Sequence, residues 1–354
     1  MKTGLKQRGR ANFNLLADLA AWSGRELQAS AERTLDKQLE SKTLPEGARE
    51  RLRLGYELLG NSRSFAWDRF YTRVIAERQY VAALEAYQDG EAEIRAEYEA
   101  NADKGGVLEL NPDVEIPDYW TTEFHLTPGG WDGHEHMGFM IHDYVYDLIF
   151  ATGGIGAIKP GDHFSDLRYV AAVEGNRDHY DNILELGVGT GRYALALQRA
   201  YPNAKIHGVD LGASELLHAK LIAARSGFEW NLRQAQAEAT GYDADTFDLT
   251  SAFILFHEIP APAAKAVVQE AFRVTKPGGE FLVADVAPYS EHENLFRSVV
   301  LDWETENRNE PFWRGALLTD RRALLESAGF VDVQEYSVGT ANYPWITKGV
   351  KPAA

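Results

Sequence analysis

The 354-residue sequence predicts an α/β protein with a Rossmann-like, doubly wound and mostly parallel sheet of seven strands, whose last strand is antiparallel, preceded by an all-helical N-terminal domain. Three observations carry this prediction. An apolar run ending in Glu185 is followed at once by glycines spaced G-x-G-x-G, and a second apolar run ends in Asp210. From residue 181 onward short apolar runs alternate with helical patterns, whereas residues 12–102 show helical spacing and no strand pattern.

The first domain, residues 1–105, is expected to consist of helices. Its apolar residues recur at helical spacing over residues 13–20, 52–59 and 65–84. Turns are expected at Pro45 with Gly47 and at residues 60–62. The sequence leaves open whether this domain closes over a site as a lid or pairs two subunits.

The second segment, residues 106–180, joins the two halves and is expected to act as an active-site lid. Its prolines and glycines predict loops at first. A helix is expected over residues 137–150, a break at the glycine-rich residues 153–156, and a second helix over residues 164–173.

The third domain, residues 181–354, carries the sheet. After the fifth strand, a helix is expected between Asp320 and Gly329, because a capping residue opens the pattern and a glycine closes it. Residues 331–338 and 343–350 are then expected to form the last two strands.

The turn over residues 187–191 suits a ligand that touches bare backbone, because glycines leave no side chain in the way and the helix that follows presents its N–H groups. A carboxylate such as Asp210, at the tip of the next strand, is suited to bind the two hydroxyls of a ribose. A dinucleotide fingerprint, G-x-G-x-x-G, would need a small residue where Arg192 stands. The pattern therefore indicates a nucleoside cofactor and disfavours a nicotinamide dinucleotide.

Further motifs follow in a fixed order. The third strand and the approach to the fourth are matched by residues 236–238 and 246–249. The fourth strand and its exit are matched by residues 251–258. An R-V-L-K-P-G-G turn, which precedes a fifth strand, is similar to residues 273–280. Taken in this order, the motifs resemble the class I S-adenosylmethionine (SAM) dependent methyltransferases. The resemblance covers about half of the chain and implies SAM as the cofactor and methyl transfer as the reaction.

The resemblance also implies where cofactor groups lie. Glu185 is expected near the amino group of the methionine portion, Asp210 at the ribose, and Gln236 where many relatives place an aspartate against the adenine. The structural alternatives are an ordinary glycine turn, a helix cap at Asp210 and a solvent-facing Gln236. The expected cofactor-binding residues are Glu185, Gly187, Gly189, Gly191, Asp210, Leu211, Gln236 and Ala237.

Three residues are candidates for catalysis. His257 and Glu258 leave the fourth strand at the carboxyl edge of the sheet, where such folds bind ligands. An imidazole there can take a proton from a hydroxyl or amine acceptor. His125, on the expected lid, is the third candidate. The alternatives are a histidine packed under the cofactor and a turn cap at Glu258, and Asp285 at the end of the fifth strand is equally open.

Four of the ten histidines lie within eighteen residues, at His125, His134, His136 and His142. In an extended strand the H-x-H spacing would point two rings to one face and suit zinc or iron. The glycine-rich context predicts a loop, and the chain has no cysteine to add a thiolate ligand. No metal is therefore assigned, and a metal-dependent enzyme built on this cluster stays an alternative.

The charge balance bears on partners. The formal net charge is −17, with 17 basic and 17 acidic residues in 1–104 against 19 and 36 in 105–354. Nucleic acid and an anionic membrane surface both attract basic proteins, so neither is expected as a partner. The absence of cysteine excludes disulfides and iron–sulfur clusters. No run approaches the roughly 18 apolar residues of a membrane helix, and no apolar core follows the basic start, so a cytoplasmic location is expected.

The function expected from the sequence is SAM-dependent methylation of a small organic acceptor, first at oxygen, with nitrogen, carbon and sulfur left open. A SAM-binding fold turned to other chemistry is one alternative, and a binding module without turnover is another. A homodimer is compatible with the helical first domain.

Overall fold

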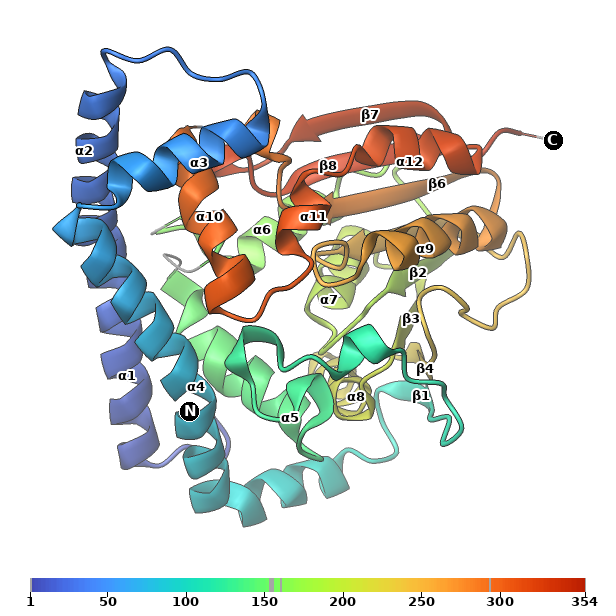
Figure 1. Ribbon diagram of the computed structural model, residues 1–354. Helices are drawn as coiled ribbons and strands as arrows, with labels where there is room; N and C mark the ends of the chain where they lie inside the picture. Colours follow the sequence, from blue (N-terminus) through green and yellow to red (C-terminus); the bar gives the residue numbers. More distant parts are fainter. Residues whose placement is uncertain (1, 153–155, 160, 293, 354) are drawn as a thin grey trace.

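The computed structural model describes residues 2–152, 156–159, 161–292 and 294–353; the break expected at the glycines of 153–156 therefore lies mostly outside the described residues. The predicted α/β class is confirmed, since one sheet carries helices on both faces. Figure 1 shows α1, α2 and α4 along one flank of the molecule and the sheet with α9 and α12 on the other. The first four helices are α1 (Gln7–Trp22), α2 (Ala29–Leu39), α3 (Ala48–Leu59) and α4 (Arg63–Ala100).

The sheet has eight strands in the order β1-β4-β3-β2-β5-β6-β8-β7. All neighbouring pairs are parallel except those of β8, which runs antiparallel to β6 and β7, so the antiparallel last strand is confirmed. The strands are β1 (Gly106–Glu109), β2 (Asn182–Leu186), β3 (Lys205–Asp210), β4 (Trp230–Gln234), β5 (Phe247–Phe253), β6 (Thr275–Asp285), β7 (Val331–Ser337) and β8 (Trp345–Val350).

The sheet departs from the sequence prediction at its first edge. The expected seven strands are joined by β1, which comes from the connecting segment and pairs with β4. The third strand is β4, and residues 236–238, which were expected to mark that strand, lie in the loop after it. The strand is hard to read from sequence because only Trp230 and Leu232 are buried in it and its remaining residues are polar.

Helices cover both faces of the sheet, as its buried parallel strands require. On one face α6 (Phe164–Ala172), α7 (Arg192–Ala200) and α8 (Ala213–Ser226) pack on Ile183, Ile206 and Trp230. On the other face α9 (Ala261–Val274) and α12 (Arg321–Ala328) pack on Leu184 and Phe281. The helix α12 is capped as expected, with the Asp320 side chain accepting from the Ala323 N–H and Gly329 in the left-handed region.

The remaining helices join the sheet to the N-terminal helices. The helix α10 (Leu295–Asn307) packs, with α11 (Trp313–Leu317), against α2 and α3. The helix expected over 137–150 is one turn of α5 (Met137–Phe139) followed by wide π-type turns to Tyr146. No helix among the described residues is both long and apolar enough to span a lipid bilayer.

Candidate active site

A cavity opens at the carboxyl ends of β2, β3 and β5, the edge at which open α/β sheets bind ligands. Its empty space, including the open mouth, is about 1060 Å³. One wall is the glycine turn after β2. Another wall is made of aromatic side chains from the connecting segment, residues 106–180. The cavity is therefore bounded by elements far apart in the sequence.

The glycine turn presents bare backbone to the cavity. The N–H groups of Gly187 and Val188 both donate to the Val209 carbonyl at 2.9 Å, which ties the turn to β3. Gly189 has φ 48°, and a Cβ there would meet no atom within 4 Å because it would project into the cavity. Gly191 has a different role, since its Cβ would lie 2.7 Å from the Trp230 ring, and it does not line the cavity. Gly189 thus leaves room for a ligand, whereas Gly187 and Gly191 make room for the side chains of Leu255 and Trp230.

Glu185 lies buried at the base of the cavity, 2% exposed. Its Oε2 atom makes no hydrogen bond within the described residues. Burial raises the pKa of this carboxyl well above its usual value, although the nearby Arg168 works in the opposite direction. Arg168 also lines the cavity, and burial lowers its pKa to about 10. A buried carboxyl and a buried guanidinium therefore face the same space.

Asp210 ends β3 with both carboxylate oxygens anchored. Oδ2 accepts from the Gly189 N–H at 2.8 Å and Oδ1 from the Gly212 N–H at 2.9 Å. Each oxygen keeps a further lone pair for a ligand in the cavity. Burial raises the pKa of this carboxyl to about 6, against the effect of the backbone N–H groups. The helix-cap alternative is not observed, because α8 has Gly212 at its cap position and no side-chain cap.

The loop after β4 forms another stretch of wall. Leu211 and Ala237 line the cavity, as expected, together with Glu238, whose carboxylate accepts from the Tyr119 hydroxyl at 2.6 Å. Gln236 does not line it. Its side-chain amide turns outward and donates to the Glu115 carbonyl at 2.7 Å, while its own carbonyl accepts from the Ala239 N–H and so opens the tight turn that carries Ala237 and Glu238.

The three catalytic candidates meet at the far end of the cavity, but only Glu258 lines it. Glu258 Oε1 lies 3.7 Å from His125 Nε2 and 3.7 Å from His257 Nε2. Each histidine has a second carboxylate behind it: His257 Nδ1 lies 2.7 Å from Asp285, and His125 pairs with the buried Glu310. The arrangement is a chain of alternating acids and imidazoles with Glu258 in the middle.

Electrostatics favours the charged form of these imidazoles. Burial works against protonation of His125, but the carboxylates of Glu310 and Glu258 outweigh it and raise its pKa to about 9. Burial likewise opposes protonation of His257, and Asp285 raises its pKa above the usual value. His257 is packed under the site against the Trp313 ring, 4.6 Å between centroids. The structure thus assigns it a place behind Glu258 and away from the cavity surface.

Aromatic side chains surround the Glu258 end of the cavity. Trp131 stacks on Phe124 with centroids 6.2 Å apart and meets the His125 ring edge-on at 5.1 Å. At the end of β5, Ile254 has φ 52°, a conformation that costs a β-branched residue on the order of 1–3 kcal/mol. The aromatic residues that line the cavity are Tyr119, Trp120, Phe124, Trp131, Tyr146, Tyr193 and Phe253.

The four clustered histidines are dispersed in the structure. His134 Nδ1 accepts from the backbone N–H of His136, whose own ring contacts the Tyr87 hydroxyl at 2.7 Å. His142 contacts Thr190 at 2.9 Å, and His125 pairs with Glu310. Within the described ranges no three histidine or acidic side chains are arranged to hold a metal ion. The structure therefore gives no support to the metal-enzyme alternative.

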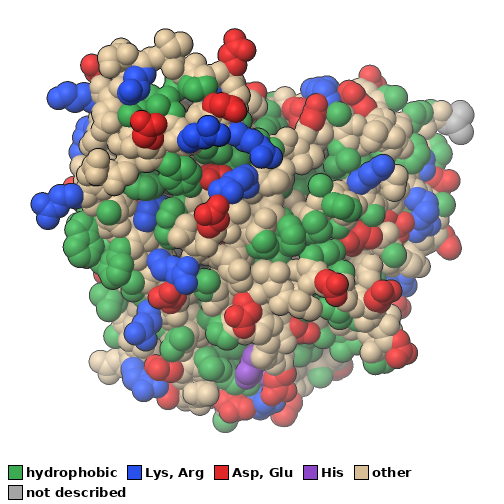
Figure 2. Space-filling model, in the orientation of Figure 1, with side chains coloured by type: hydrophobic (Ala, Val, Ile, Leu, Met, Phe, Trp, Pro, Cys, Tyr) green, Lys and Arg blue, Asp and Glu red, His purple; other side chains and the backbone are tan. Residues whose placement is uncertain are grey.

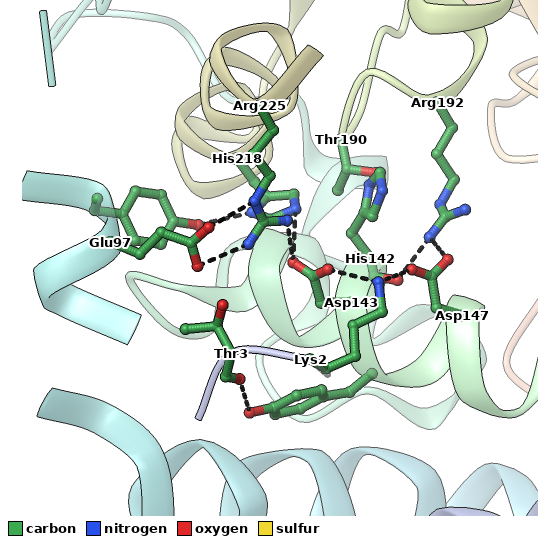
Figure 3. A network of polar contacts seen from close by, with 12 residues as sticks. Lys2, Thr3, Glu97, His142, Asp143, Asp147, Thr190, Arg192, His218 and Arg225 are labelled. Atoms are coloured by element: carbon green, nitrogen blue, oxygen red, sulfur yellow. Dashed lines mark hydrogen bonds and ion pairs between the residues drawn. The ribbon is translucent and has the colours of Figure 1, made fainter. Parts of the chain in front are cut away.

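A polar network holds residues 142–147 of the connecting segment against the glycine turn (Figure 3). His142 contacts Thr190 of the turn, and Arg192 at the start of α7 donates to the His142 carbonyl at 2.6 Å and pairs with Asp147. Next to it, Asp143 binds Lys2 at 3.0 Å and Arg225 of α8 at 2.8 Å. Arg192, the residue that distinguishes this turn from a dinucleotide fingerprint, thus connects the sheet to the segment that covers it.

Sequence reasoning missed several residues of the site. Arg168, Tyr146, Glu215 and Trp120 line the cavity, and Glu310 supports it from behind. Of these residues, only Arg168 has a sequence context that could have marked it as part of a site. It lies on α6 beside the buried Leu167 and Ala171, and a cation on an otherwise apolar helix face is unusual enough to mark a site.

Comparison with known proteins agrees with this geometry. The family model of the methyltransferase domain matches residues 183–279, which run from β2 into the turn within β6. The chain is 28% identical over 204 residues to a ubiquinone/menaquinone biosynthesis C-methyltransferase from Desulfotalea psychrophila, which covers 52% of this chain and 78% of that protein.

A second relative covers less. The chain is 30% identical over 128 residues to a ubiquinone biosynthesis O-methyltransferase from Sodalis glossinidius, 35% of this chain and 49% of that protein, so it spans about half of that relative's length. Among solved structures, phosphoethanolamine N-methyltransferase 2 from Haemonchus contortus in complex with SAM is 14% identical, with a TM-score of 0.47, covering 67% of this chain and 60% of that one.

The matched residues include β2, the glycine turn after it and Asp210, which all contribute to the cavity wall. An orphaned buried carboxylate oxygen at Glu185 and an open backbone position at Gly189 fit the amino group and tail of a methionine derivative. Residues 183–279 of this chain therefore carry a methyltransferase domain, and SAM is its cofactor.

Proposed function

We propose that the chain transfers the methyl group of SAM to a hydroxyl of a small aromatic acceptor, and that residues 181–354 bind the cofactor while residues 106–180 form the lid over the acceptor. When bound, SAM supplies an electrophilic methyl group on a positively charged sulfur. Alignment of the acceptor and exclusion of water are what the protein must add.

At the cofactor end, Glu185 binds the ammonium group and Arg168 the carboxylate of the methionine portion. Two buried groups of opposite charge suit a ligand that carries the complementary pair. Asp210 accepts hydrogen bonds from the ribose hydroxyls while its other lone pairs hold the turn. Leu211 and Ala237 pack on the adenine.

At the acceptor end, the aromatic wall supports a flat ring. Tyr119, Phe124, Trp131 and Tyr146 offer apolar faces, and Glu258 is the cavity-lining carboxylate that lies 3.7 Å from His125. Both cavity-lining arginines within the described residues, Arg168 and Arg192, come from helices beside the glycine turn. The apolar faces of this wall favour a hydroxylated aromatic ring as the acceptor. The O-methyltransferase name of one relative supports the same choice.

The observation that carries the proposal is the carboxylate of Glu258 between two imidazoles. Glu258 accepts the proton from the acceptor's hydroxyl as the new oxygen–carbon bond forms and the sulfur–carbon bond breaks. His125 and His257 are positioning residues, because each acts through Glu258 and is held by its own carboxylate. The proton leaves to solvent through the open mouth, since Glu258 is 20% exposed.

The test is release of S-adenosylhomocysteine with a panel of phenols, aromatic amines and aliphatic alcohols. We expect turnover with a phenol, and we expect Glu258→Gln to lower kcat by about 10²- to 10⁴-fold, the contribution of a positioned proton acceptor, with unchanged SAM affinity by calorimetry. Glu306→Gln, on the exposed side of α10, serves as the control. Methylation confined to amines, or a Glu258→Gln enzyme as fast as wild type, would contradict the proposal.

A further inference from the structure

A groove lies behind the Glu258 end of the cavity, between α9, α11 and the start of α12. Its empty space, including the open mouth, is about 500 Å³, which is the size of a small-molecule site. Figure 2 shows hydrophobic side chains gathered around the start of α9, which forms one side of the groove. The lining is mainly apolar, with Phe256, Pro260 and Pro311 among its residues. The groove therefore suits a ligand with an apolar body.

A single layer of side chains separates this groove from the cavity. Ile259 lines both spaces, so it stands between them. Phe312 lines the groove, and its ring lies 6.2 Å from that of Tyr119 and 6.3 Å from that of Phe124, centroid to centroid. Those two rings belong to the cavity wall. A molecule in the groove would thus lie beside the cavity without entering it.

One charged residue lines the groove. Arg321, the first residue of α12, is 3% exposed. Its Nη2 atom donates to the Val286 carbonyl at 2.7 Å, but Nε and Nη1 make no hydrogen bond within the described residues. A buried guanidinium whose N–H groups lack acceptors is costly, and such a group calls for an explanation. An acceptor from outside the chain provides one.

The carboxylates near Arg321 do not supply the missing acceptors. Asp285 and Glu335 both attract the guanidinium, yet burial outweighs them and lowers the pKa of Arg321 below its usual value. Asp285 pairs with His257 at 2.7 Å, and Glu335 lies 3.5 Å from Arg322. Both acids are therefore engaged by other cations, and the groove keeps an excess of positive charge at Arg321.

We propose that this groove is a second small-molecule site, which binds a monocarboxylate with an apolar body. The carboxylate lies on Arg321, whose planar guanidinium matches its two oxygens, and the body packs on Phe256, Ile259 and Phe312. A neutral or basic ligand would leave the Arg321 donors without acceptors. A phosphate would bring about two negative charges to one unpaired cation. The lining and the charge together favour a singly charged carboxylate.

The first experiment is calorimetry of octanoate binding to the whole protein in the presence of saturating S-adenosylhomocysteine. We expect octanoate to bind, and octanol, which has the same chain without the charge, to bind about tenfold more weakly or less, the scale of lost charged hydrogen bonds. Octylamine should not bind. Absence of octanoate binding, equal binding of octanol, or competition between octanoate and S-adenosylhomocysteine overturns the proposal.

A pair of neighbouring arginines supplies a matched test of the charge. Arg321→Gln should bind octanoate about tenfold more weakly or less and should no longer prefer it to octanol. Arg322→Gln is the control, because it removes the same charge one residue farther along α12, outside the groove. Circular dichroism checks that both variants are folded. A folded Arg321→Gln protein that still prefers octanoate rejects the assigned role of Arg321.

A third variant tests the groove without touching its charge. Gly315 of α11 lines the groove, and a Cβ there would meet no atom within 4 Å, so Gly315→Phe can fill the space without a clash in the chain. It should lose octanoate binding and keep its affinity for S-adenosylhomocysteine, since Gly315 does not line the cavity. If octanoate binds this folded variant as tightly as wild type, the ligand lies elsewhere and the proposal fails.

Discussion

The two ends of the cavity are built in different ways. The cofactor end comes from two adjacent strands and the turn between them, with Glu185, Gly189 and Asp210 within 26 residues of sequence. The proposed acceptor end brings Tyr119 and His125 from the connecting segment, residues 106–180, Glu258 from the exit of β5 and Glu310 from beyond α10. The residues of the first end lie close together in the sequence, whereas those of the second end come together only in the folded chain.

The difference extends to the groups that would bind a ligand. At the cofactor end, backbone N–H groups and two buried carboxylates are fixed by the sheet, so the site is preformed. At the proposed acceptor end, side chains from the connecting segment complete the wall, and the network of Arg192, Asp147 and His142 holds that segment against the glycine turn. We infer that substitutions at the first end change cofactor binding and those at the second change turnover.

The largest effect is expected at the cofactor end from Gly189→Val. The added side chain would occupy the space that the methionine tail needs, so calorimetry should detect no SAM binding. Gly227→Val is a matched control, because Gly227 also has positive φ, 73°, and also has no atom within 4 Å of an added Cβ, but caps α8 outside the cavity. Equal loss of binding in both variants would mean that backbone strain, and not crowding, is responsible.

The contrast also explains what the sequence could and could not predict. A strand, a glycine turn and a strand-end carboxylate form a pattern within one stretch of sequence, so the α/β fold was predicted correctly, and the binding of the cofactor by Glu185, Gly189 and Asp210 stays a prediction. The edge strand β1 was missed because its four residues, the first of which is the second glycine of a pair, give too short a pattern. Tyr146 and Glu310 were missed because nothing near them in sequence marks chemistry, and only tertiary packing brings them to Glu258.

The same reasoning separates His257 from Glu258. Both follow β5, and their sequence offers no means to tell which one faces the ligand. In the structure the His257 imidazole is turned toward Asp285 and the Trp313 ring, which leaves the carboxylate of its neighbour on the cavity wall. The distinction depends on the path of the chain at Ile254, whose positive φ is not encoded by any turn residue.

A smaller effect is expected from Asp210, and it depends on pH. Its pKa of about 6 means that the carboxylate loses its charge as the pH falls below neutrality, so SAM affinity should decline through pH 6. Asp210→Asn should bind SAM about 1–3 kcal/mol more weakly at pH 7.5 and lose that pH dependence. Calorimetry across pH 5 to 8 measures both.

The stability of the unliganded protein supplies the control for this substitution. The pKa of Asp210 is raised on folding from 3.8, so its contribution to stability is present below that value and is lost as the pH rises through about 6. Asp210→Asn should therefore melt no lower than wild type at pH 7.5. A clear drop in its melting temperature would show that the carboxylate is needed for the fold of the turn as well as for the ligand.

The smallest effect is expected from Gln236→Ala, and it tests the position at which the resemblance and the structure disagree. Because the Gln236 amide donates to the Glu115 carbonyl and points away from the cavity, its removal should change SAM binding by less than about 0.5 kcal/mol. Ala237→Leu, at the neighbouring residue that lines the wall, should weaken binding because it fills space beside the adenine. If Gln236→Ala weakens binding tenfold instead, the cofactor must draw the amide inward and break its contact with Glu115, and this wall of the cofactor end would then be formed by the ligand.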